Sequence, residues 1–112
     1  MEPVALATRV EMSGDVAVLH AEGDVDLASA DALKTALAGA LEQSSTVVVD
    51  LGAVGFIDST GLSALVWGHG QAQEAGGSLR LRRPTPMLRR LLEITALDTV
   101  LVTEDSDDPS GN

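Results

Sequence analysis

The chain of 112 residues contains no cysteine and no tyrosine, and Phe56 and Trp67 are its only large aromatic residues. Without cysteine there is no disulfide framework and no thiolate chemistry, as is common in a reducing cytoplasm. With only two rings, the chain lacks the aromatic platforms on which single-stranded nucleic acid stacks. Its core must therefore be built mainly from Leu, Val and Ala.

Basic residues are also scarce, because seven Lys and Arg residues stand against 17 Asp and Glu residues and give a formal net charge of −10. This charge repels nucleic-acid phosphates and anionic lipids, so we expect neither a direct nucleic-acid partner nor a membrane partner. No apolar run approaches the ~20 residues of a membrane span, and residues 1–5 lack the basic and apolar regions of a signal peptide. We expect a cytoplasmic protein.

The features that are present indicate one folded domain. The length fits a single domain, and a hydrophobic content of 45% is typical of a globular protein with a packed core. Four acidic residues are gathered in the last segment, at Glu104, Asp105, Asp107 and Asp108. We therefore predict a folded domain over residues 1–103 and an acidic, disordered tail over residues 104–112.

Five segments have the composition of β-strands. The first two flank the turn cluster Ser13-Gly14-Asp15 and predict a β-hairpin, whereas the third is a β-branched run typical of a strand in the middle of a sheet. The fourth alternates Leu with Arg, so one of its faces should be buried and the other solvated. In chain order, the predicted strands are 7–12, 16–21, 46–51, 78–83 and 100–102.

Three segments have apolar residues at three- and four-residue spacing, the pattern of helices with one buried face. Ser29 is expected to cap the first, and Thr85 the third, in which Pro86 takes the tolerated first position. The second should end near Gly76-Gly77. The predicted buried faces are Leu33, Leu37, Ala40 and Leu41 in the first helix, Leu62, Leu65 and Val66 in the second, and Met87, Leu88, Leu91 and Leu92 in the third.

The order of these elements indicates a fold of the α/β class. Strands that alternate with helices predict a sheet with helices packed on it. Because the two strands of the opening hairpin run antiparallel, the sheet is expected to be mixed, with four to five strands. We predict a single domain of this architecture.

The segment Asp58-Ser59-Thr60-Gly61-Leu62 lies where the predicted central strand gives way to a helix. The Ser59 hydroxyl should therefore lie at the helix N-terminus, among free backbone N–H groups that can hold a phosphate. The simpler interpretation is that Asp58 or Ser59 is a helix cap worth ~1 kcal/mol and nothing more. The residues alone leave both interpretations open.

Patterns typical of catalysis or metal binding are missing. His69 has no acidic residue or second histidine at helical spacing, and His20 lies in a predicted strand. A serine nucleophile on a strand-to-helix turn requires Gly-x-Ser-x-Gly, whereas this segment reads Ile57-Asp58-Ser59-Thr60-Gly61. We expect no catalytic residue, no metal and no cofactor, and hence a protein that is not an enzyme.

Two further features allow two interpretations each. Asp26 is either a turn residue or part of a contact surface. A group of arginines forms either a basic patch for an acidic partner or ordinary solvated faces, and their alternating positions favour the solvated faces. These arginines are Arg80, Arg82, Arg83, Arg89 and Arg90.

Taken together, several segments resemble the signature of STAS domains, a family named for sulfate transporters and anti-sigma factor antagonists. The resemblance is carried by 48–51 and 54–62, which read VVDL and VGFIDSTGL. The segment 23–27 is similar to an earlier Gly-Glu-apolar-Asp element of the family, with an aspartate in place of the usual glutamate. The segment 91–98 resembles the family's late helix and following turn, so the resemblance covers nearly the whole chain.

The resemblance implies an anti-sigma factor antagonist that works by partner switching in bacterial stress responses. Unphosphorylated, it would bind an anti-sigma factor that is itself a serine kinase, and so regulate sigma-factor-dependent transcription. Phosphorylation of Ser59 would release the partner, and a serine phosphatase would reset the switch. Thr60 offers a second hydroxyl, but the resemblance favours Ser59. The expected partner-binding residues are Asp26, Asp58, Ser59, Thr60, Gly61 and Leu62.

Elementary electrostatics agrees with such a switch, because a phosphate adds a charge of about −1.5 to −2 next to Asp58. An alternative reading is a non-catalytic STAS scaffold or adaptor subunit in a stressosome-like or lipid-transport assembly, in which Ser59 is only a helix cap. The identity of the sigma factor, kinase, phosphatase and inducing signal does not follow from the residues, and neither does the oligomeric state.

Overall fold

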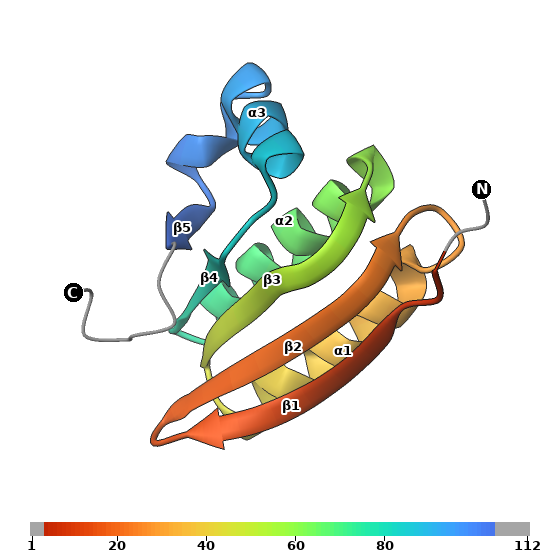
Figure 1. The fold of residues 1–112 in the computed structure, drawn as a ribbon. Coiled ribbons are helices and arrows are strands. Elements are labelled where there is room, and N and C mark those ends of the chain that lie inside the picture. Colours follow the sequence, from red (N-terminus) through yellow and green to blue (C-terminus); the bar gives the residue numbers. More distant parts are fainter. Residues whose placement is uncertain (1–3, 105–112) are drawn as a thin grey trace.

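A five-stranded mixed sheet forms the frame of residues 4–104, the part of the chain that the computed structural model describes (Figure 1). The strands lie in chain order across the sheet; β1 is antiparallel to β2, and every other neighbouring pair is parallel. The predicted fold class and the opening hairpin are confirmed. The strands are β1 (Ala7–Ser13), β2 (Val16–Val25), β3 (Thr46–Ile57), β4 (Ser78–Arg82) and β5 (Val102–Glu104).

Three α-helices accompany the sheet: α1 (Ala30–Gln43), α2 (Ser59–Glu74) and α3 (Pro86–Ile94), with a 3-10 turn (Leu97–Thr99) before β5. Figure 1 shows α1 and α2 behind the sheet, whereas α3 lies apart from them, beyond the end of β4. Within residues 4–104, no helix is both long and apolar enough to cross a membrane.

The core lies between the sheet and its helices and is almost wholly aliphatic. Alternate residues of the three inner strands point toward α1 and α2, and α3 adds two leucines at four-residue spacing. This is the Leu, Val and Ala core that the scarcity of aromatic residues predicts. Its main members are Leu19, Leu33, Leu37, Val47, Val49, Leu51, Leu62, Leu65, Leu79, Leu81, Leu88 and Leu92.

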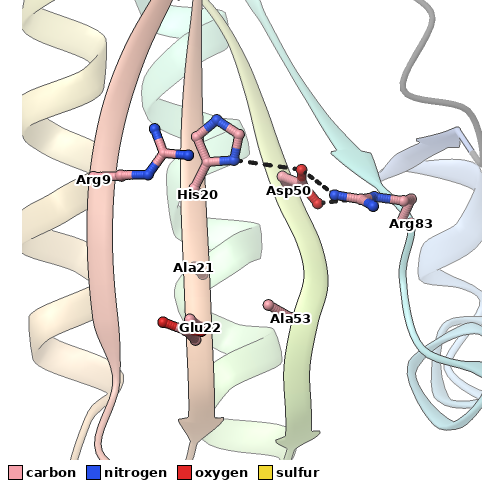
Figure 2. Close-up of a pocket in the computed structure, with 7 residues that line it drawn as sticks. All are labelled: Arg9, His20, Ala21, Glu22, Asp50, Ala53 and Arg83. Atoms are coloured by element: carbon pink, nitrogen blue, oxygen red, sulfur yellow. Dashed lines mark hydrogen bonds and ion pairs between the residues drawn. The ribbon is translucent and has the colours of Figure 1, made fainter.

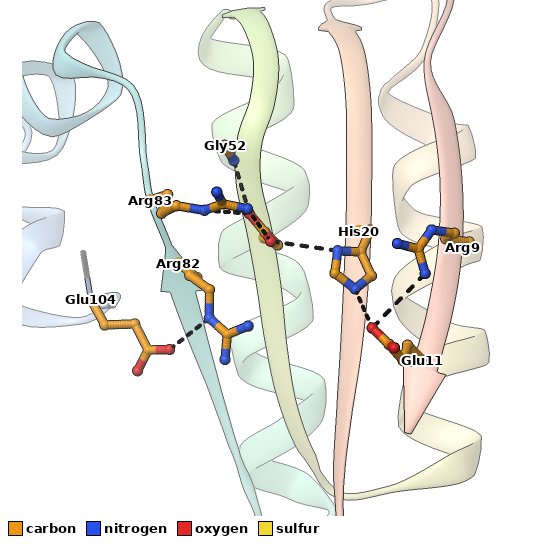
Figure 3. Close-up of polar contacts among 8 residues, drawn as sticks. Arg9, Glu11, His20, Gly52, Arg82, Arg83 and Glu104 are labelled. Carbon is orange, nitrogen blue, oxygen red and sulfur yellow. Dashed lines mark hydrogen bonds and ion pairs between the residues drawn. The ribbon is translucent and has the colours of Figure 1, made fainter. Parts of the chain in front are cut away.

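The opposite face of the sheet carries a row of charged and polar side chains. Arg9, His20, Asp50, Arg82 and Glu104 are cross-strand partners along the five strands in turn. Figure 3 shows the contacts in and beside this row: His20 Nδ1 lies 3.4 Å from Asp50 Oδ2, and Arg82 Nε donates to Glu104 Oε1 at 3.1 Å. Opposite charges on facing strands stabilise their pairing, so the row helps to fix the register.

Asp50 is the central residue of this row and is only 4% exposed. Arg83 holds it with two hydrogen bonds, Nη2 to Oδ2 at 2.6 Å and Nε to Oδ1 at 3.2 Å (Figure 2). The Gly52 N–H donates a third hydrogen bond to Asp50, at 3.0 Å (Figure 3). Burial alone would raise the pKa of Asp50, but these hydrogen bonds and the nearby charges of Arg83 and His20 bring it below its ordinary value. The carboxylate is therefore ionised and paired.

Gly52 makes room for this ion pair. A Cβ at position 52 would lie 2.7 Å from Arg83 Cζ, so any side chain there would displace the guanidinium from Asp50. Arg83 itself has a φ of 51°, in the left-handed region, which ends β4 at Arg82 where the sequence predicted a strand through residue 83.

The structure corrects the sequence prediction at several other places. β2 and β3 continue to Val25 and Ile57, where the predicted strands ended at residues 21 and 51. Ser29 stands at the N-cap position of α1 but makes no capping hydrogen bond; its hydroxyl instead donates to the Asp24 carbonyl in the preceding loop. Met87 is 60% exposed where burial was expected, because Leu88 and Leu92 already fill the contact between α3 and the core. Arg82 is buried beside Glu104, so it does not belong to a solvated face.

The last strand is shifted by two residues from its prediction. Val100 caps the end of the 3-10 turn and Leu101 follows it, and β5 runs from Val102 to Glu104. Glu104, expected to begin the acidic tail, is thus a strand residue that pairs with Arg82. The remaining residues of that predicted tail, 105–112, lie outside the described residues.

We expect Arg83→Gln to lower the free energy of unfolding by about 2 kcal/mol. Removing one partner of a buried ion pair leaves an uncompensated charge, and the half-exposed guanidinium moderates the loss. Arg80→Gln is the matched control, because Arg80 is exposed and lies 4.0 Å from Glu104; its loss should stay within about 0.5 kcal/mol. Urea unfolding measures the loss of stability in both variants. Equal losses would show that Arg83 does not stabilise the buried Asp50 carboxylate.

Candidate functional site

The predicted site residues gather at one end of the sheet because β2 and β3 finish side by side. Val25 pairs with Ile57, and the Asp58 N–H donates to the Val25 carbonyl at 3.1 Å. Asp26 and Asp58 each follow one of these paired residues, so the two carboxylate-bearing loops leave the same edge of the sheet. The carboxyl ends of parallel strands are a common place for binding sites.

Asp58 forms a complete N-cap for α2. Its Oδ1 accepts hydrogen bonds from the Thr60 N–H at 2.9 Å, from the Thr60 hydroxyl and from the Gly61 N–H at 3.2 Å. The Thr60 hydroxyl contributes most to lowering the pKa of Asp58 below its ordinary value, against a smaller opposing effect of burial, and the backbone N–H groups add to it. The cap is therefore a carboxylate at neutral pH.

Gly61 allows α2 to start against the sheet. A Cβ at position 61 would lie 2.6 Å from Cγ1 of both Val25 and Ile57, closer than a side chain tolerates. Leu62 follows it and is buried in the core. Gly61 and Leu62 thus fix the position of the loop from its buried side, and neither presents a side chain at the surface.

The two hydroxyls of the segment differ in their surroundings. Ser59 is exposed as the first residue of α2, and its backbone carbonyl accepts from the Ser63 hydroxyl. Thr60 is half-buried, and its hydroxyl donates to Asp58. Of the two, Ser59 carries the hydroxyl that a partner can reach.

The N-terminus of α2 differs from the sequence expectation, which placed free backbone N–H groups around Ser59. The N–H groups of Thr60 and Gly61 donate to the Asp58 carboxylate, and that of Leu62 donates to the Asp58 carbonyl. Because Asp58 already accepts these three bonds, a phosphate on Ser59 cannot use them.

Asp26 lies in a tight loop between β2 and α1. Its Oδ1 accepts from the Ala28 N–H at 3.0 Å and from the Ser29 hydroxyl at 3.3 Å, while the Asp26 N–H donates to the Ser29 hydroxyl oxygen. These bonds are those of a turn residue, and the side chain is half-buried. The same bonds hold Leu27 out into solvent, where it is 78% exposed.

An apolar groove of about 360 Å³ lies next to Ser59. One wall comes from the end of β3 and the start of α2, where Phe56 is 42% exposed. The other wall comes from α3, where Met87 and Ile94 are 60% and 71% exposed, and Arg90 lies among them. Exposed apolar side chains gathered around a groove are typical of a surface that contacts a partner.

Sequence reasoning missed this groove. It assigned Met87 to the core and Arg90 to a solvated face, and it gave no role to Phe56 or Ile94. A signal was present in α3, because its apolar residues cover more of the helix surface than one contact with the core can bury. The excess is the exposed wall of the groove.

A second, polar hollow of about 170 Å³ lies on the open face of the sheet, between Arg9, His20, Glu22 and Arg83 (Figure 2). Asp50 at its floor is held by Arg83, and His20 lies 2.9 Å from Glu11 and 3.4 Å from Asp50. Asp50, Arg83, His20 and Glu11 thus contact one another, and these contacts serve the pairing of strands across the sheet.

The fold and the capped strand-to-helix junction are features of one class of protein domain. The family model described as "Mlab, STAS domain" matches residues 8–103. The chain therefore belongs to the STAS domain family, as its sequence motifs predicted.

Similar proteins define the branch within this family. The chain is 34% identical to the anti-sigma-B factor antagonist of Bacillus subtilis over 79 residues, which cover 70% of this chain and 72% of that protein. The structure of an anti-sigma factor antagonist from Mycobacterium paratuberculosis is similar with a TM-score of 0.83 and 28% identity, covering 93% of this chain and 89% of the other. The chain is thus a STAS domain of the anti-sigma factor antagonist branch.

A more distant relative shares the fold alone. The Bacillus cell fate determinant SpoIIAA, solved in its phosphorylated form, has a TM-score of 0.72 at 18% identity and covers 93% of this chain and 96% of its own. The five-stranded sheet with its helices is therefore retained where little of the sequence is.

We expect Gly61→Ala to destabilise the protein by about 1–3 kcal/mol, because the added methyl group is forced against Val25 and Ile57. Gly70→Ala is the matched control on the same helix, since a Cβ there meets nothing within 4 Å. It should stabilise the protein by about 0.5–1 kcal/mol through helix propensity. Thermal and urea unfolding test the pair, and effects of the same sign would refute the close approach at Gly61.

Asp58 should also contribute to the acid sensitivity of the fold. Because its pKa is lower in the folded than in the unfolded chain, its stabilisation is complete above the ordinary value of 3.8 and is lost as the pH falls through the folded pKa. Wild type should therefore lose more free energy of unfolding than Asp58→Asn between about pH 5 and pH 2. Parallel curves of stability against pH for the two proteins would show that Asp58 contributes nothing.

Proposed function

We propose that this protein is an anti-sigma factor antagonist whose binding to an anti-sigma factor is controlled by phosphorylation of Ser59. The observation that carries the proposal is the position of Ser59. It is the exposed first residue of α2, and it lies beside an apolar groove. The name of the Bacillus subtilis relative supports the partner class. The chain acts as a binding protein and leaves catalysis to its partners.

The partner is an anti-sigma factor of the serine kinase type, which binds the unphosphorylated domain and thereby leaves its sigma factor free for transcription. The kinase transfers the γ-phosphoryl group of ATP to the Ser59 oxygen, which loses its proton, and ADP leaves. A serine phosphatase hydrolyses the phosphate ester and restores the hydroxyl. The switch operates in the cytoplasm.

The surroundings of Ser59 support release on phosphorylation. A phosphate brings a charge of about −1.5 to −2 next to the Asp58 carboxylate, at an edge of the sheet that also carries Asp26. Inside an interface these like charges lose their water and repel more strongly. Asp58 and Thr60 hold the start of α2 by their own hydrogen bonds, so the same charge leaves the fold intact.

The proposed contact surface is centred on Ser59 and combines two kinds of residues. Asp26, Asp58, Ser59 and Thr60 lie at the surface or are half-buried there, and they contact the partner directly. Gly61 and Leu62 are buried and contribute by holding the segment in place. Phe56 and Ile94 extend the surface along the groove.

The test is capture from a lysate of the native host with wild type, Ser59→Ala and Ser59→Asp as baits. We expect wild type and Ser59→Ala to retain an ATP-binding serine kinase that Ser59→Asp loses by at least about tenfold, a difference near 1.4 kcal/mol. Ser13→Asp is the matched control, because it adds the same charge at an exposed hairpin position and should bind like wild type.

The captured kinase is then purified and incubated with ATP and each bait. Phosphate should enter wild type and fail to enter Ser59→Ala, as measured by mass spectrometry. If all baits retain the same large assembly or the same transporter subunits, the protein is a scaffold or adaptor in which Ser59 only begins a helix, and the proposal is wrong.

A further inference from the structure

The start of α2 provides no counter-ion for a phosphate on Ser59. The N–H groups of Thr60, Gly61 and Leu62 are already bonded to Asp58, whose carboxylate repels an added phosphate. Any cation that pairs with a dianion placed here must therefore come from another element.

Arg90 is the cation that lines the same groove as Ser59. It projects from α3, is exposed, and forms no hydrogen bond or ion pair with any residue between 4 and 104. Arg89, its neighbour in sequence, is half-buried, already has an interaction partner, and does not line this groove. The two arginines thus carry the same charge in different places.

The chemistry of the two groups is complementary. A guanidinium presents parallel N–H donors that match two phosphate oxygens, and such charge-assisted pairs are stronger than neutral hydrogen bonds. A long, exposed arginine side chain can turn toward the groove at little cost, because no existing pair has to be broken. A protein of net charge −10 offers few other cations to a phosphate.

We propose that Arg90 binds the phosphate of phosphorylated Ser59 across the groove, and that this ion pair closes the groove between the start of α2 and α3. The inference rests on the proposed function in one respect, namely that Ser59 is the phosphorylated residue. The ion pair adds a second cause of release. The phosphate repels the partner, and the closed groove also covers the apolar walls at Phe56 and Met87 that the partner would contact.

The experiment uses the full chain with phosphoserine incorporated at position 59 during translation, so that no kinase or partner is needed. The second pKa of the phosphate, ordinarily about 6, is followed by ³¹P NMR titration. Wild type should titrate about 0.3–0.7 pKa unit lower than Arg90→Gln, as expected for an exposed ion pair. Arg89→Gln is the matched control, and its phosphate should titrate like that of wild type.

A second measurement reports closure of the groove. The methyl signal of Met87 should shift on phosphorylation of wild type and remain in place in phosphorylated Arg90→Gln, with the exposed Met12 on β1 as an internal reference. Arg90→Lys should retain part of the titration shift, because it keeps the charge and loses the planar pair of donors.

Equal titration shifts in Arg89→Gln and Arg90→Gln, or no shift in either, would overturn the proposal. A Met87 signal that still shifts when the Arg90→Gln variant is phosphorylated would also overturn it. These outcomes are separable from the proposed function. If the titration shows the ion pair while the phosphorylated chain still holds its kinase, the Arg90 contact exists and the partner switch fails.

Discussion

The parallel pairing of Val25 with Ile57 is the constraint on which the site depends. Between the pair Val16–Thr46 and this one, β3 uses two more residues than β2, and two register shifts near Glu22 and Gly23 absorb the difference. Irregularities of this kind re-aim the end of a strand. As a result both strands finish at the same level, and the loops that follow them meet at one edge of the sheet.

At that edge, some residues hold the backbone in place and another presents its hydroxyl to solvent. Asp58 uses its carboxylate on the backbone of α2, and Gly61 lets the helix approach the sheet. Ser59 stands between them with its hydroxyl free at the surface. Because the cap is supplied by the preceding residue, the serine can change its chemical state without removing a hydrogen bond that the fold needs.

The sequence was sufficient for the order of the elements, since periodicity and capping residues are local signals. Thr85 caps α3 through the Leu88 N–H as expected, and the aliphatic run of β3 occupies the centre of the sheet. Local signals could not show how hydrogen bonds compete. Ser29 has the right identity and position for a cap, yet the Asp24–Asp26 loop takes its hydroxyl.

The groove and the buried charges could not be predicted for a related reason. Whether Met87 is core or surface depends on how much of α3 the sheet can cover, which is a property of the packed molecule. In the same way, Arg82 and Arg83 look like solvated residues in an alternating strand, and only the register reveals Asp50 and Glu104 beside them.

The two faces of α3 have an evolutionary consequence. Leu88 and Leu92 anchor the helix in the core, whereas Met87 and Ile94 form the groove wall without being needed for that anchor. Mutations can therefore alter the wall while the frame stays intact. Under the proposed function, a genome that duplicates this domain can give each copy its own wall, and in this way keep several signalling routes from interfering with one another inside one cell.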